Sequence, residues 1–313
     1  MAANRLGITC AGNWIVDRVK VIDAWPQEER LANILGEARS GGGGAHNVVI
    51  DLARMKAPFP LRGVGMVGAD EDGRWLLQES YQNQVDITGI VQTKERPTSY
   101  TEVMTVRATG RRTFFHHRGA NTLLDEEHVD PGNSRILHLA YLLLLDRIDP
   151  VAARLLQRLR AQGVRTSLDL VSAEKARFQE VAVPALDHVD YLILNEIEAG
   201  ECAGLAIRKP DGSFDRDALA QAARKLRRDN LVVIHLPEGA FALSKEGEQW
   251  APSKPVKRIA STVGAGDAFC AGVLYGLHEG WPVLQCLDLG HLAAAACLGH
   301  ETTTGGLRPV AEL

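Results

Sequence analysis

No stretch of apolar residues in this chain reaches the roughly 18 residues that a membrane-spanning helix needs. The first apolar stretch, residues 6–16, is interrupted by Asn13 and closed by Asp17, so it predicts a buried strand rather than a signal peptide. The five cysteines are odd in number, widely spaced and form no Cys-x-x-Cys pair. We therefore expect reduced thiols in a cytoplasmic protein without a membrane partner. Three cysteines fall in apolar helical patterns of the predicted core: Cys270, Cys286 and Cys297.

Motifs of several large protein classes are missing as well. The chain has no GxxxxGK[ST] phosphate loop, no HExxH motif and no zinc-binding spacing of Cys and His. Its 35 Lys and Arg residues are dispersed among 39 Asp and Glu residues, so no basic footprint for a nucleic acid exists. With 313 residues, 45% of them hydrophobic, the chain can form one large α/β domain or two small ones.

The chain does contain an alternation of strand-like and helix-like segments. Strands are expected at 6–11, 64–67, 136–145, 166–170, 191–194 and 231–236. Helices are expected at 48–55, 75–83, 151–161, 219–228 and 284–297. This alternation predicts an α/β fold, in which helices cover both faces of a mostly parallel sheet.

Two segments break the alternation. Residues 98–107 and 112–118 alternate apolar and polar side chains around Ala-Thr-Gly at 108–110, which predicts a β-hairpin. Residues 13–38 form a second irregular stretch that is rich in Val, Ile and charge. Two β-rich excursions from an α/β core indicate a small lid that can close over a ligand.

The most informative segment is Ser-Thr-Val-Gly-Ala-Gly-Asp-Ala-Phe at 261–269. Apolar residues recur after it at helical spacing, so that Asp267 opens an amphipathic helix. An acid in this position is commonly only a helix cap or a first-turn charge. Here the small residues beside it leave the first-turn N–H groups open to an anion. That arrangement suits a general base that faces a transferred phosphoryl group.

The segment resembles the C-terminal signature of the ribokinase-like, or PfkB-type, carbohydrate kinases, which reads Asp-Thr-x-Gly-Ala-Gly-Asp-x-Phe. The resemblance follows the family in order over nearly the whole chain. It implies that Asp267 deprotonates a sugar hydroxyl, and that the amides of Gly264, Ala265 and Gly266 form an anion hole for the γ-phosphate of ATP.

The resemblance also implies the architecture, a three-layer α/β core whose sheet is mostly parallel, with a small β-sheet lid over the sugar. We assign residues 1–12, 39–96 and 121–313 to the core, and residues 13–38 and 97–120 to the lid. Because the lid of this family often doubles as a dimer interface, a homodimer through the lid is expected.

A glycine-rich run at 41–47, Gly-Gly-Gly-Gly-Ala-His-Asn, looks like the N-terminal Gly-Gly-x-x-x-Asn signature of the same family. Taken alone, it predicts a flexible loop with Asn47 as a helix cap. The resemblance implies instead that Gly42, Gly43 and Asn47 contact the sugar. His46 stands where the family usually has a small residue, and it either shapes the pocket or is a solvated loop histidine.

Three further polar residues are expected at the sugar site. An Asp just after a strand is often a turn former, but the family places a sugar-binding Asp here, so we assign Asn13 and Asp17 to the sugar. Arg118 ends the hairpin, where an arginine is commonly a solvated edge charge. It also lies where members that bind acidic sugars keep a carboxylate-binding Arg. His116, two residues earlier, would point to the same strand face.

The nucleotide side is expected at Asn-Glu-Ile-Glu, residues 195–198. Acids after a strand often begin a helix, but the pattern resembles the family's Asn-x-x-Glu motif. That motif implies that Asn195 and Glu198 touch the phosphates and that Glu198 holds Mg²⁺ through water, with Glu196 as the neighbouring alternative. Gly266 and His291 complete the expected ATP contacts, and His291 stands where an Asn is common.

The chain departs from the family at three places. The leading Asp of the signature is Ser261 and its second Thr position is Val263, which leaves activation by K⁺ open. The usual Asp-Pro-Asn is Asp-Leu-Val at 169–171. The nucleotide-side loop, usually Thr-x-Gly-x-x-Gly, carries three other residues: His235, Pro237 and Ala240. Nucleotide preference is therefore open too.

One glycine pattern is a decoy. Residues 63–68, Gly-Val-Gly-Met-Val-Gly, fit the dinucleotide fingerprint, but they fall within the predicted strand rather than in the turn after it, which argues against a dehydrogenase.

From the motifs and the resemblance together, we expect an ATP-dependent sugar kinase that phosphorylates a primary hydroxyl. Two alternatives stay open: a kinase of a nucleoside or of an acidic or phosphorylated sugar, and a non-catalytic sugar-binding regulator that descends from a kinase.

Overall fold

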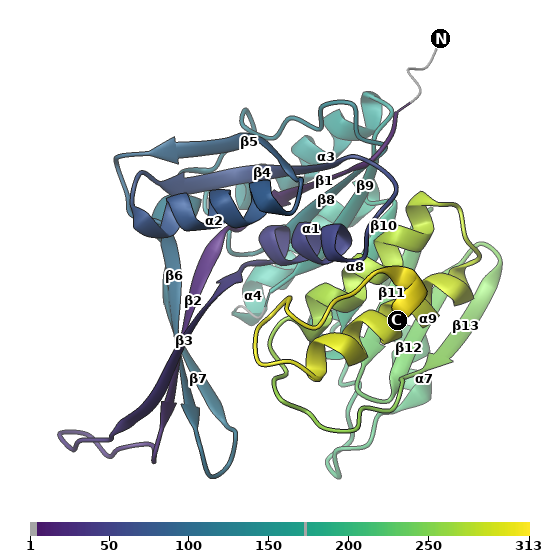
Figure 1. Ribbon diagram of the computed structural model, residues 1–313. Coiled ribbons are helices and arrows are strands. Elements are labelled where there is room, and N and C mark those ends of the chain that lie inside the picture. Colours follow the sequence, from purple (N-terminus) through teal and green to yellow (C-terminus); the bar gives the residue numbers. More distant parts are fainter. Residues whose placement is uncertain (1–4, 172–173) are drawn as a thin grey trace.

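A computed structural model describes residues 5–171 and 174–313 and contains two sheets (Figure 1). The large sheet has nine strands in the order β13-β12-β11-β10-β9-β8-β1-β4-β5. Its strands from β5 to β11 pair in parallel, whereas β12 and β13 add an antiparallel edge. Their bounds are β1 Ile8–Gly12, β4 Leu61–Gly68, β5 Asp86–Thr93, β8 Ile136–Leu142, β9 Arg165–Leu170, β10 Tyr191–Asn195, β11 Leu231–Leu236, β12 Gly239–Ser244 and β13 Gly247–Pro252.

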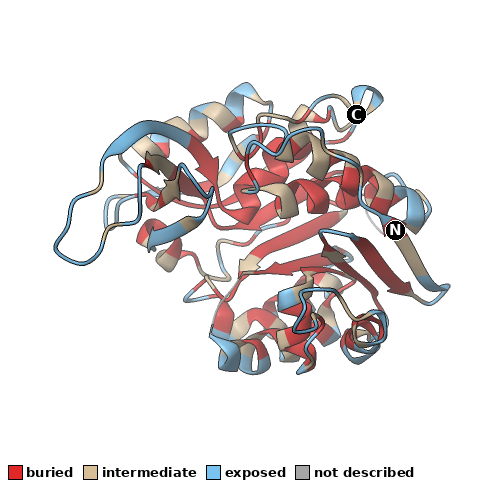
Figure 2. Ribbon diagram, turned by 90° about the horizontal axis from the view of Figure 1, so that it is seen from below, coloured by how far each residue is buried: buried red, intermediate tan, exposed pale blue. Residues whose placement is uncertain are grey.

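Helices cover both faces of the large sheet, and two apolar cores result. On one face lie α1 (Gly44–Arg54), α2 (Glu71–Gln82), α8 (Ala265–His278) and α9 (Val283–Leu298). The other face is covered by α3 (Ala152–Ala161), α6 (Glu196–Ala203), α7 (Arg216–Leu226) and the short α4 (Lys175–Arg177) and α5 (Val183–Ala185). Figure 2 shows the sheet and the helix faces turned toward it as buried. The predicted α/β architecture is confirmed.

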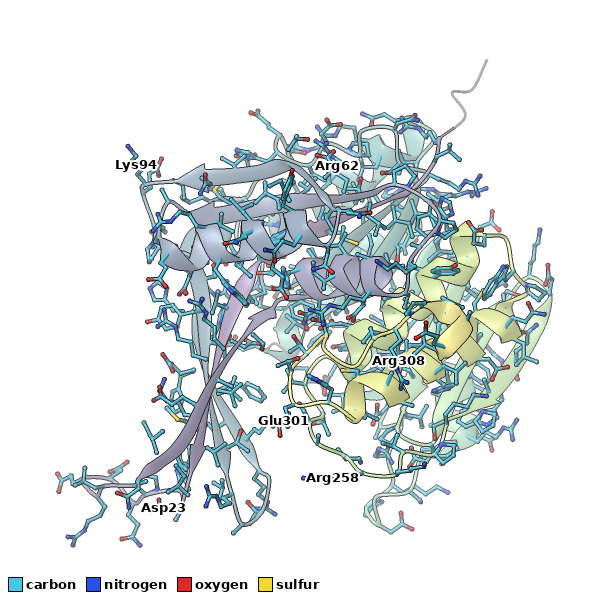
Figure 3. All side chains as sticks on the ribbon, in the orientation of Figure 1. Asp23, Arg62, Lys94, Arg258, Glu301 and Arg308 are labelled. Carbon is cyan, nitrogen blue, oxygen red and sulfur yellow. The ribbon has the colours of Figure 1, made fainter. Side chains whose placement is uncertain are left out.

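The small sheet is the lid, with four strands in the order β3-β2-β6-β7. It consists of β2 (Ile15–Ile22), β3 (Ile34–Gly42), β6 (Ser99–Val106) and β7 (Arg112–His117). The hairpin expected around 108–110 is present as β6 and β7. The lid projects from the core, and Asp23 marks its far end in Figure 3. Strand β3 runs on to Gly42, so the lid sheet enters the segment from residue 39 that was expected to belong to the core.

The helix after the glycine run begins earlier than its apolar pattern predicts. α1 starts at Gly44, and its N-cap is Gly43, which has a φ of 86° and offers no side-chain cap. A Cβ at Gly43 would collide with the carbonyl oxygen of Asn13, so only glycine fits there. Asn47 therefore lies inside the helix, and the interpretation of Asn47 as a helix cap was wrong.

The glycines of the decoy pattern have a packing role. They lie within β4, as the sequence predicts, and a Cβ at Gly63 or Gly65 would collide with the indole ring of Trp14. That ring is fully buried and donates its Nε1 hydrogen to the carbonyl oxygen of Val64 over 3.0 Å. The pattern thus makes room for an aromatic side chain rather than for a dinucleotide.

Strand β8 ends at Leu142, three residues before the predicted end at residue 145. Tyr141 and Leu143 have left-handed φ values of 58° and 82°, which turn the chain away from the sheet. Their N–H groups go to carboxylates instead of a neighbouring strand: the Tyr141 N–H donates to Asp169 Oδ1 over 2.6 Å, and the Leu143 N–H to Asp149 Oδ1 over 3.0 Å. This early end places the Tyr141 side chain at the carboxyl edge of the sheet.

Cysteine placement and membrane topology can both be checked against the described residues. All five cysteines are free thiols and are buried, as predicted for Cys270, Cys286 and Cys297. Within 5–171 and 174–313, every helix is too short or too polar to cross a membrane.

Candidate active site

Asp267 lies in the first turn of α8 and is 5% exposed. The residue before this helix, Gly264, is its N-cap and has a left-handed φ of 83°. A Cβ at Gly264 would lie 2.6 Å from the carbonyl oxygen of Thr303, so the position needs glycine. The helix begins there with Ala265 and Gly266, whose small side chains leave its first-turn N–H groups uncovered. The predicted anion nest therefore has the backbone that such a nest requires.

The carboxylate of Asp267 is held through one oxygen. Asn47 Nδ2 donates to Oδ2 over 2.7 Å, and the Tyr141 hydroxyl donates to the same atom over 3.1 Å. Among the described residues, no hydrogen bond reaches the other oxygen, Oδ1. Burial and the neighbouring Asp169 raise the Asp267 pKa to about 6, although the two donors and His138 oppose this. One oxygen is thus fixed and the other is available to accept a proton.

Asp267 borders a small cavity of about 120 Å³ at the carboxyl ends of several parallel strands. Tyr141, Asp169 and Asn195 reach it from the ends of β8, β9 and β10. Ligand sites of open parallel sheets lie at this edge. Other residues complete the wall on the side of the nucleotide motifs: Glu198, His235, Gly264, Gly266 and Cys270. The predicted base and the predicted Asn-x-x-Glu motif therefore meet in one cavity.

A larger cavity of about 610 Å³ lies between the lid and the core, and Tyr141 separates it from the small one. Asp17 lines it from β2, and Gly43 and Asn47 line it from the start of α1. Burial raises the Asp17 pKa to about 7; a hydrogen bond from Thr101 lowers it and the charge of Asp267 raises it. A Cβ at Gly42 would collide with the Asp17 carboxylate, so this glycine makes room for the acid.

The other residues expected around the sugar are buried behind this cavity. Asn13 is fully buried and donates from Nδ2 to the carbonyl oxygen of Tyr141 over 3.4 Å, and its Oδ1 has no partner within 5–171 and 174–313. His46 is also fully buried, with its ring edge-on to Trp14 and its Nε2 3.3 Å from Glu79 Oε2. Of the two interpretations of His46, the solvated loop histidine is excluded, and the residue supports the helix that carries Asn47.

Arg118 is placed differently from the prediction. Its guanidinium forms an ion pair with Asp146 at the surface, and Arg118 is outside the set of residues that line the large cavity. The cause is the end of β7 at His117, which puts Arg118 after the strand. Arg112, at the other end of β7, does line the cavity. His116 lines it too and contacts Thr101 Oγ1 through Nδ1 over 3.0 Å.

Asn195 and Glu198 form a complete capping box at the start of α6. Asn195 Oδ1 accepts the N–H groups of Ile197 and Glu198, and Glu198 Oε2 accepts the Asn195 N–H over 3.1 Å. Burial raises the Glu198 pKa to about 8; the Asn195 backbone hydrogen bond opposes this, and Asp169 and Asp267 reinforce it. The neighbouring alternative, Glu196, is paired with Arg208 at 3.0 Å. Glu198 is therefore the acid that faces the small cavity.

A third cavity of about 660 Å³ adjoins the anion nest on the side away from the lid. Asn195, Pro237, Gly266 and His291 are among the residues that line it. His235 lies between this cavity and the small one; burial, together with His291, lowers its pKa to about 4, so the imidazole is neutral. The His291 ring nitrogen Nε2 is 3.1 Å from the carbonyl oxygen of Ala251. Asn195, Gly266 and His291 of the predicted ATP contacts thus share this cavity, whereas Glu198 lines the small one.

The fold and this site define a phosphotransferase whose acceptor is an alcohol group. The family model for pfkB family carbohydrate kinases matches residues 11–309, and the chain belongs to that family.

Relatives and solved structures agree with that membership. Ribokinase of Arabidopsis thaliana is 25% identical over 287 residues, which are 88% of this chain and 72% of that protein. The 5-dehydro-2-deoxygluconokinase of Geobacillus kaustophilus is 23% identical over 293 residues, which are 87% of this chain and 83% of that protein. The structure of Arabidopsis thaliana ribokinase complexed with ribose and ATP superposes with a TM-score of 0.81 at 21% identity, covering 99% of this chain and 97% of that one. The ribokinase-like fold expected from the sequence is confirmed.

Two residues at the site were missed by the sequence reasoning. Tyr141 appeared to be an interior strand residue, and Arg112 was one of several arginines in the hairpin. A usable signal existed for Tyr141, because polar side chains at the carboxyl end of a parallel strand are candidates for a site. For Arg112 no sequence signal was available, since its partners Thr262 and Ser261 are about 150 residues away in the chain.

Proposed function

We propose that the protein is an ATP-dependent sugar kinase that transfers the γ-phosphate to a primary hydroxyl of a small sugar, with Asp267 as the general base. The observation that carries this proposal is the geometry of Asp267. Its Oδ2 is fixed by Asn47 and Tyr141, and its Oδ1 has no donor among the residues that the structure describes. The carboxylate also stands beside the open N–H groups of α8. A base and an anion nest in one helix turn match the needs of phosphoryl transfer.

The sugar is assigned to the large cavity under the lid. Asp17 and Asn47 offer a carboxylate and an amide to adjacent hydroxyls, and Gly42 and Gly43 let the backbone approach the ring. Asn13 supports the wall through Tyr141. A hydroxyl directed past Tyr141 reaches Oδ1 of Asp267, which takes its proton. The amides of Gly264, Ala265 and Gly266 stabilise the charge of the transferred group.

The nucleotide is assigned to the third cavity, with its phosphates directed to the anion nest. Asn195, Gly266 and His291 are the contacts expected there. Asp169, Glu198 and Asp267 place three acids around the small cavity, and their mutual repulsion favours a cation among them. Glu198 fits Mg²⁺, which uses few carboxylates and keeps several waters. When bound, Mg²⁺ neutralises phosphate charge; the chain itself supplies the base, the nest and the walls.

The test is ATP consumption with and without Mg²⁺ against ketoses, pentoses, nucleosides, sugar acids and sugar phosphates. We expect Mg²⁺-dependent turnover with one class of acceptor. Sugar binding without ATP–Mg²⁺ binding in a titration calorimeter would instead identify a non-catalytic regulator. A kinase of acidic sugars is the second candidate function, because a relative at 23% identity is named 5-dehydro-2-deoxygluconokinase.

The pH dependence of activity follows from the raised carboxylate pKa values. Asp267 must be ionised to accept a proton, and its pKa is about 6 while that of the coupled Asp17 is about 7. We expect kcat/KM to fall by up to about tenfold per pH unit below pH 6–7. In the Asp17→Asn variant, the fall of kcat/KM at low pH that remains reports the protonation of Asp267. An acid limb that begins only near the ordinary Asp pKa of about 3.9 contradicts the prediction.

The stability of the ligand-free protein changes in the opposite direction. Because the pKa values of Asp267 and Asp17 are raised in the folded state, these two groups bind more protons there than in the unfolded chain. The resulting stabilisation is fully present below about pH 4 and is lost as the pH rises through about 6–7. Thermal unfolding between pH 5 and 8 measures this slope, and the Asp17→Asn variant should make it shallower.

The lid is proposed to join two copies of the chain. Its outer part exposes large apolar side chains, including Trp25 at 50% and Phe115 at 51%, and these two rings stack with centroids 6.1 Å apart. We expect a solution mass of about twice 34.0 kDa by light scattering. Phe115→Glu should halve that mass, because it places a charge in the apolar contact. A wild type that runs as a monomer at all concentrations contradicts the proposal.

A further inference from the structure

Arg112 connects the lid to the core above the sugar cavity. It is the first residue of β7, and its guanidinium reaches across to the segment before α8. Nη1 donates to Thr262 Oγ1 over 3.2 Å, and Nη2 donates to Ser261 Oγ over 3.3 Å. Arg112 lines the same cavity as Asp17 and Asn47. Its charge is therefore presented to whatever occupies the space under the lid.

This guanidinium has no carboxylate partner among residues 5–171 and 174–313. Burial is the one cause that lowers its pKa, with no contribution from an acid. Two other arginines of intermediate burial illustrate the contrast: Arg177 lies 2.5 Å from Asp149, and Arg18 lies 2.6 Å from Asp72. The hydroxyls of Ser261 and Thr262 accept two hydrogen bonds but bring no negative charge. A partly desolvated cation without a counter-charge is a binding site for an anion.

Ser261 explains why the counter-charge is missing. The signature that this segment resembles begins with Asp, and the chain has Ser at that position. Since Ser261 Oγ is within hydrogen-bond distance of Arg112, a carboxylate there would pair with the guanidinium and neutralise it. The serine keeps the contact between lid and core and leaves the charge free. This departure from the signature thus has a direct consequence for the sugar cavity.

We propose that Arg112 binds an anionic group of the acceptor, a carboxylate or a phosphate ester, so that the substrate is an acidic sugar rather than a neutral one. This inference rests on the proposed kinase function. A guanidinium offers two parallel N–H groups that match two oxygens of such a group. Asp17 on β2 of the lid, and Gly43 and Asn47 at the start of α1, line the same cavity and take the hydroxyls. Burial, together with the charges of Arg118 and His117, lowers the pKa of His116 in the same wall.

The γ-phosphate of the nucleotide is a second possible source of the anion, because Thr262 lines both the sugar cavity and the nucleotide cavity. The two sources differ in what a charge-removing variant changes. An acceptor contact alters binding and turnover of acidic sugars selectively. A nucleotide contact alters the KM for ATP, and it alters turnover of every acceptor equally.

The first experiment measures acceptor binding without catalysis. Wild type and Arg112→Gln are titrated by calorimetry with 5-dehydro-2-deoxygluconate, gluconate and ribose 1-phosphate, and with the neutral glucitol, fructose and ribose. We expect the wild type to bind an acidic probe more tightly than its neutral counterpart. Arg112→Gln should weaken that binding by roughly 10- to 150-fold, the usual range for a hydrogen bond to a charged group, and should leave neutral sugars within about threefold.

Four variants make the test specific for charge at this place. Arg112→Lys keeps the positive charge but lacks the two parallel N–H groups of the guanidinium. It should therefore lose less affinity for the acidic probe than Arg112→Gln. Ser261→Asp should weaken the acidic probe because it supplies the missing counter-charge, and it should do so more than the uncharged Ser261→Asn. Arg111→Gln is the matched control, since Arg111 is exposed on the same hairpin. It should bind every probe as the wild type does.

Kinetics with ATP then separate this inference from the kinase proposal. Loss of kcat/KM confined to acidic acceptors supports it. Preference of the wild type for neutral sugars, binding of none of the acidic probes, or an Arg112→Gln effect confined to ATP would overturn it and leave the kinase intact. Binding of an acidic sugar that depends on Arg112, with no turnover, would overturn the kinase and keep Arg112 as the anion-binding residue.

Discussion

Asp267→Asn should lower the rate of phosphoryl transfer by about 10²–10⁴-fold, the usual contribution of a general base. The substitution preserves the shape of the side chain. Its carbonyl oxygen can still accept from Asn47 and Tyr141, which now hold Oδ2 at 2.7 and 3.1 Å. Its NH₂ group then stands where Oδ1 faces the acceptor and cannot take a proton. We therefore expect KM values close to those of the wild type and a large loss of kcat.

The same variant should be more stable than the wild type near pH 8, because it removes a buried charge whose pKa burial raises to about 6. Thermal unfolding measures this and shows that the loss of rate is not a loss of fold. Asp217→Asn is the matched control, since Asp217 also stands in a first helical turn but is exposed on α7. If Asp267→Asn retains turnover within a few-fold of the control, Asp267 is not the base.

Gly264→Ala should damage both the fold near α8 and the rate. The φ of 83° costs about 1–2 kcal/mol for any residue with a Cβ. The added Cβ would also lie 2.6 Å from the Thr303 carbonyl oxygen, so the chain must shift. A shift at the N-cap misaligns the first-turn N–H groups, and loss of one such donor costs about 10²–10³-fold in kcat. Steady-state kinetics and denaturant unfolding measure the two effects.

Gly163→Ala separates backbone strain from crowding. Gly163 has a similar φ of 77°, and a Cβ there would meet no atom of the described residues within 4 Å. It should therefore lose only the free energy of the strained φ and keep full activity, because it lies far from the site in the turn after α3. If Gly264→Ala loses no more stability and no more rate than Gly163→Ala, the close approach of Thr303 has no functional role.

Local patterns predicted most of the elements, and long-range contacts account for what they missed. The strand at 231–236 was predicted with its observed bounds because, apart from His235, it consists of buried apolar residues. The hairpin of β12 and β13 was not predicted, since Gly239 and Gly247 weaken its strand pattern. The early end of β8 depends on Asp169 and Asp149, which accept the N–H groups of Tyr141 and Leu143. Both acids lie outside residues 136–145, so the local pattern could not predict where the strand ends.

In the candidate site, too, local patterns predicted some residues and long-range contacts placed the others. The acid at the start of α8 could be recognised from the small residues beside it and from the family signature. Arg118 was chosen over Arg112 because the hairpin pattern gives alternation but not the end of the strand, and β7 ends one residue before Arg118. The substrate side of the pocket depends on pairs such as Arg112 with Ser261, which are distant in the chain. Only the folded structure brings such pairs together.

The hydrogen bond from Asn47 to Asp267 spans 220 residues, and the one from the Thr303 hydroxyl to the Gly41 carbonyl oxygen spans 262. Segments far apart in the chain are therefore needed to build the pocket. During translation the glycine-rich loop leaves the ribosome before α8 and the residues after α9. It can form its hydrogen bonds to Asp267 and Thr303 only after those segments have been made. Until α8 has been synthesised, the chain lacks Asp267, the base proposed above. Truncation of the chain before Thr303 would remove the hydrogen bond that holds the glycine-rich loop at Gly41.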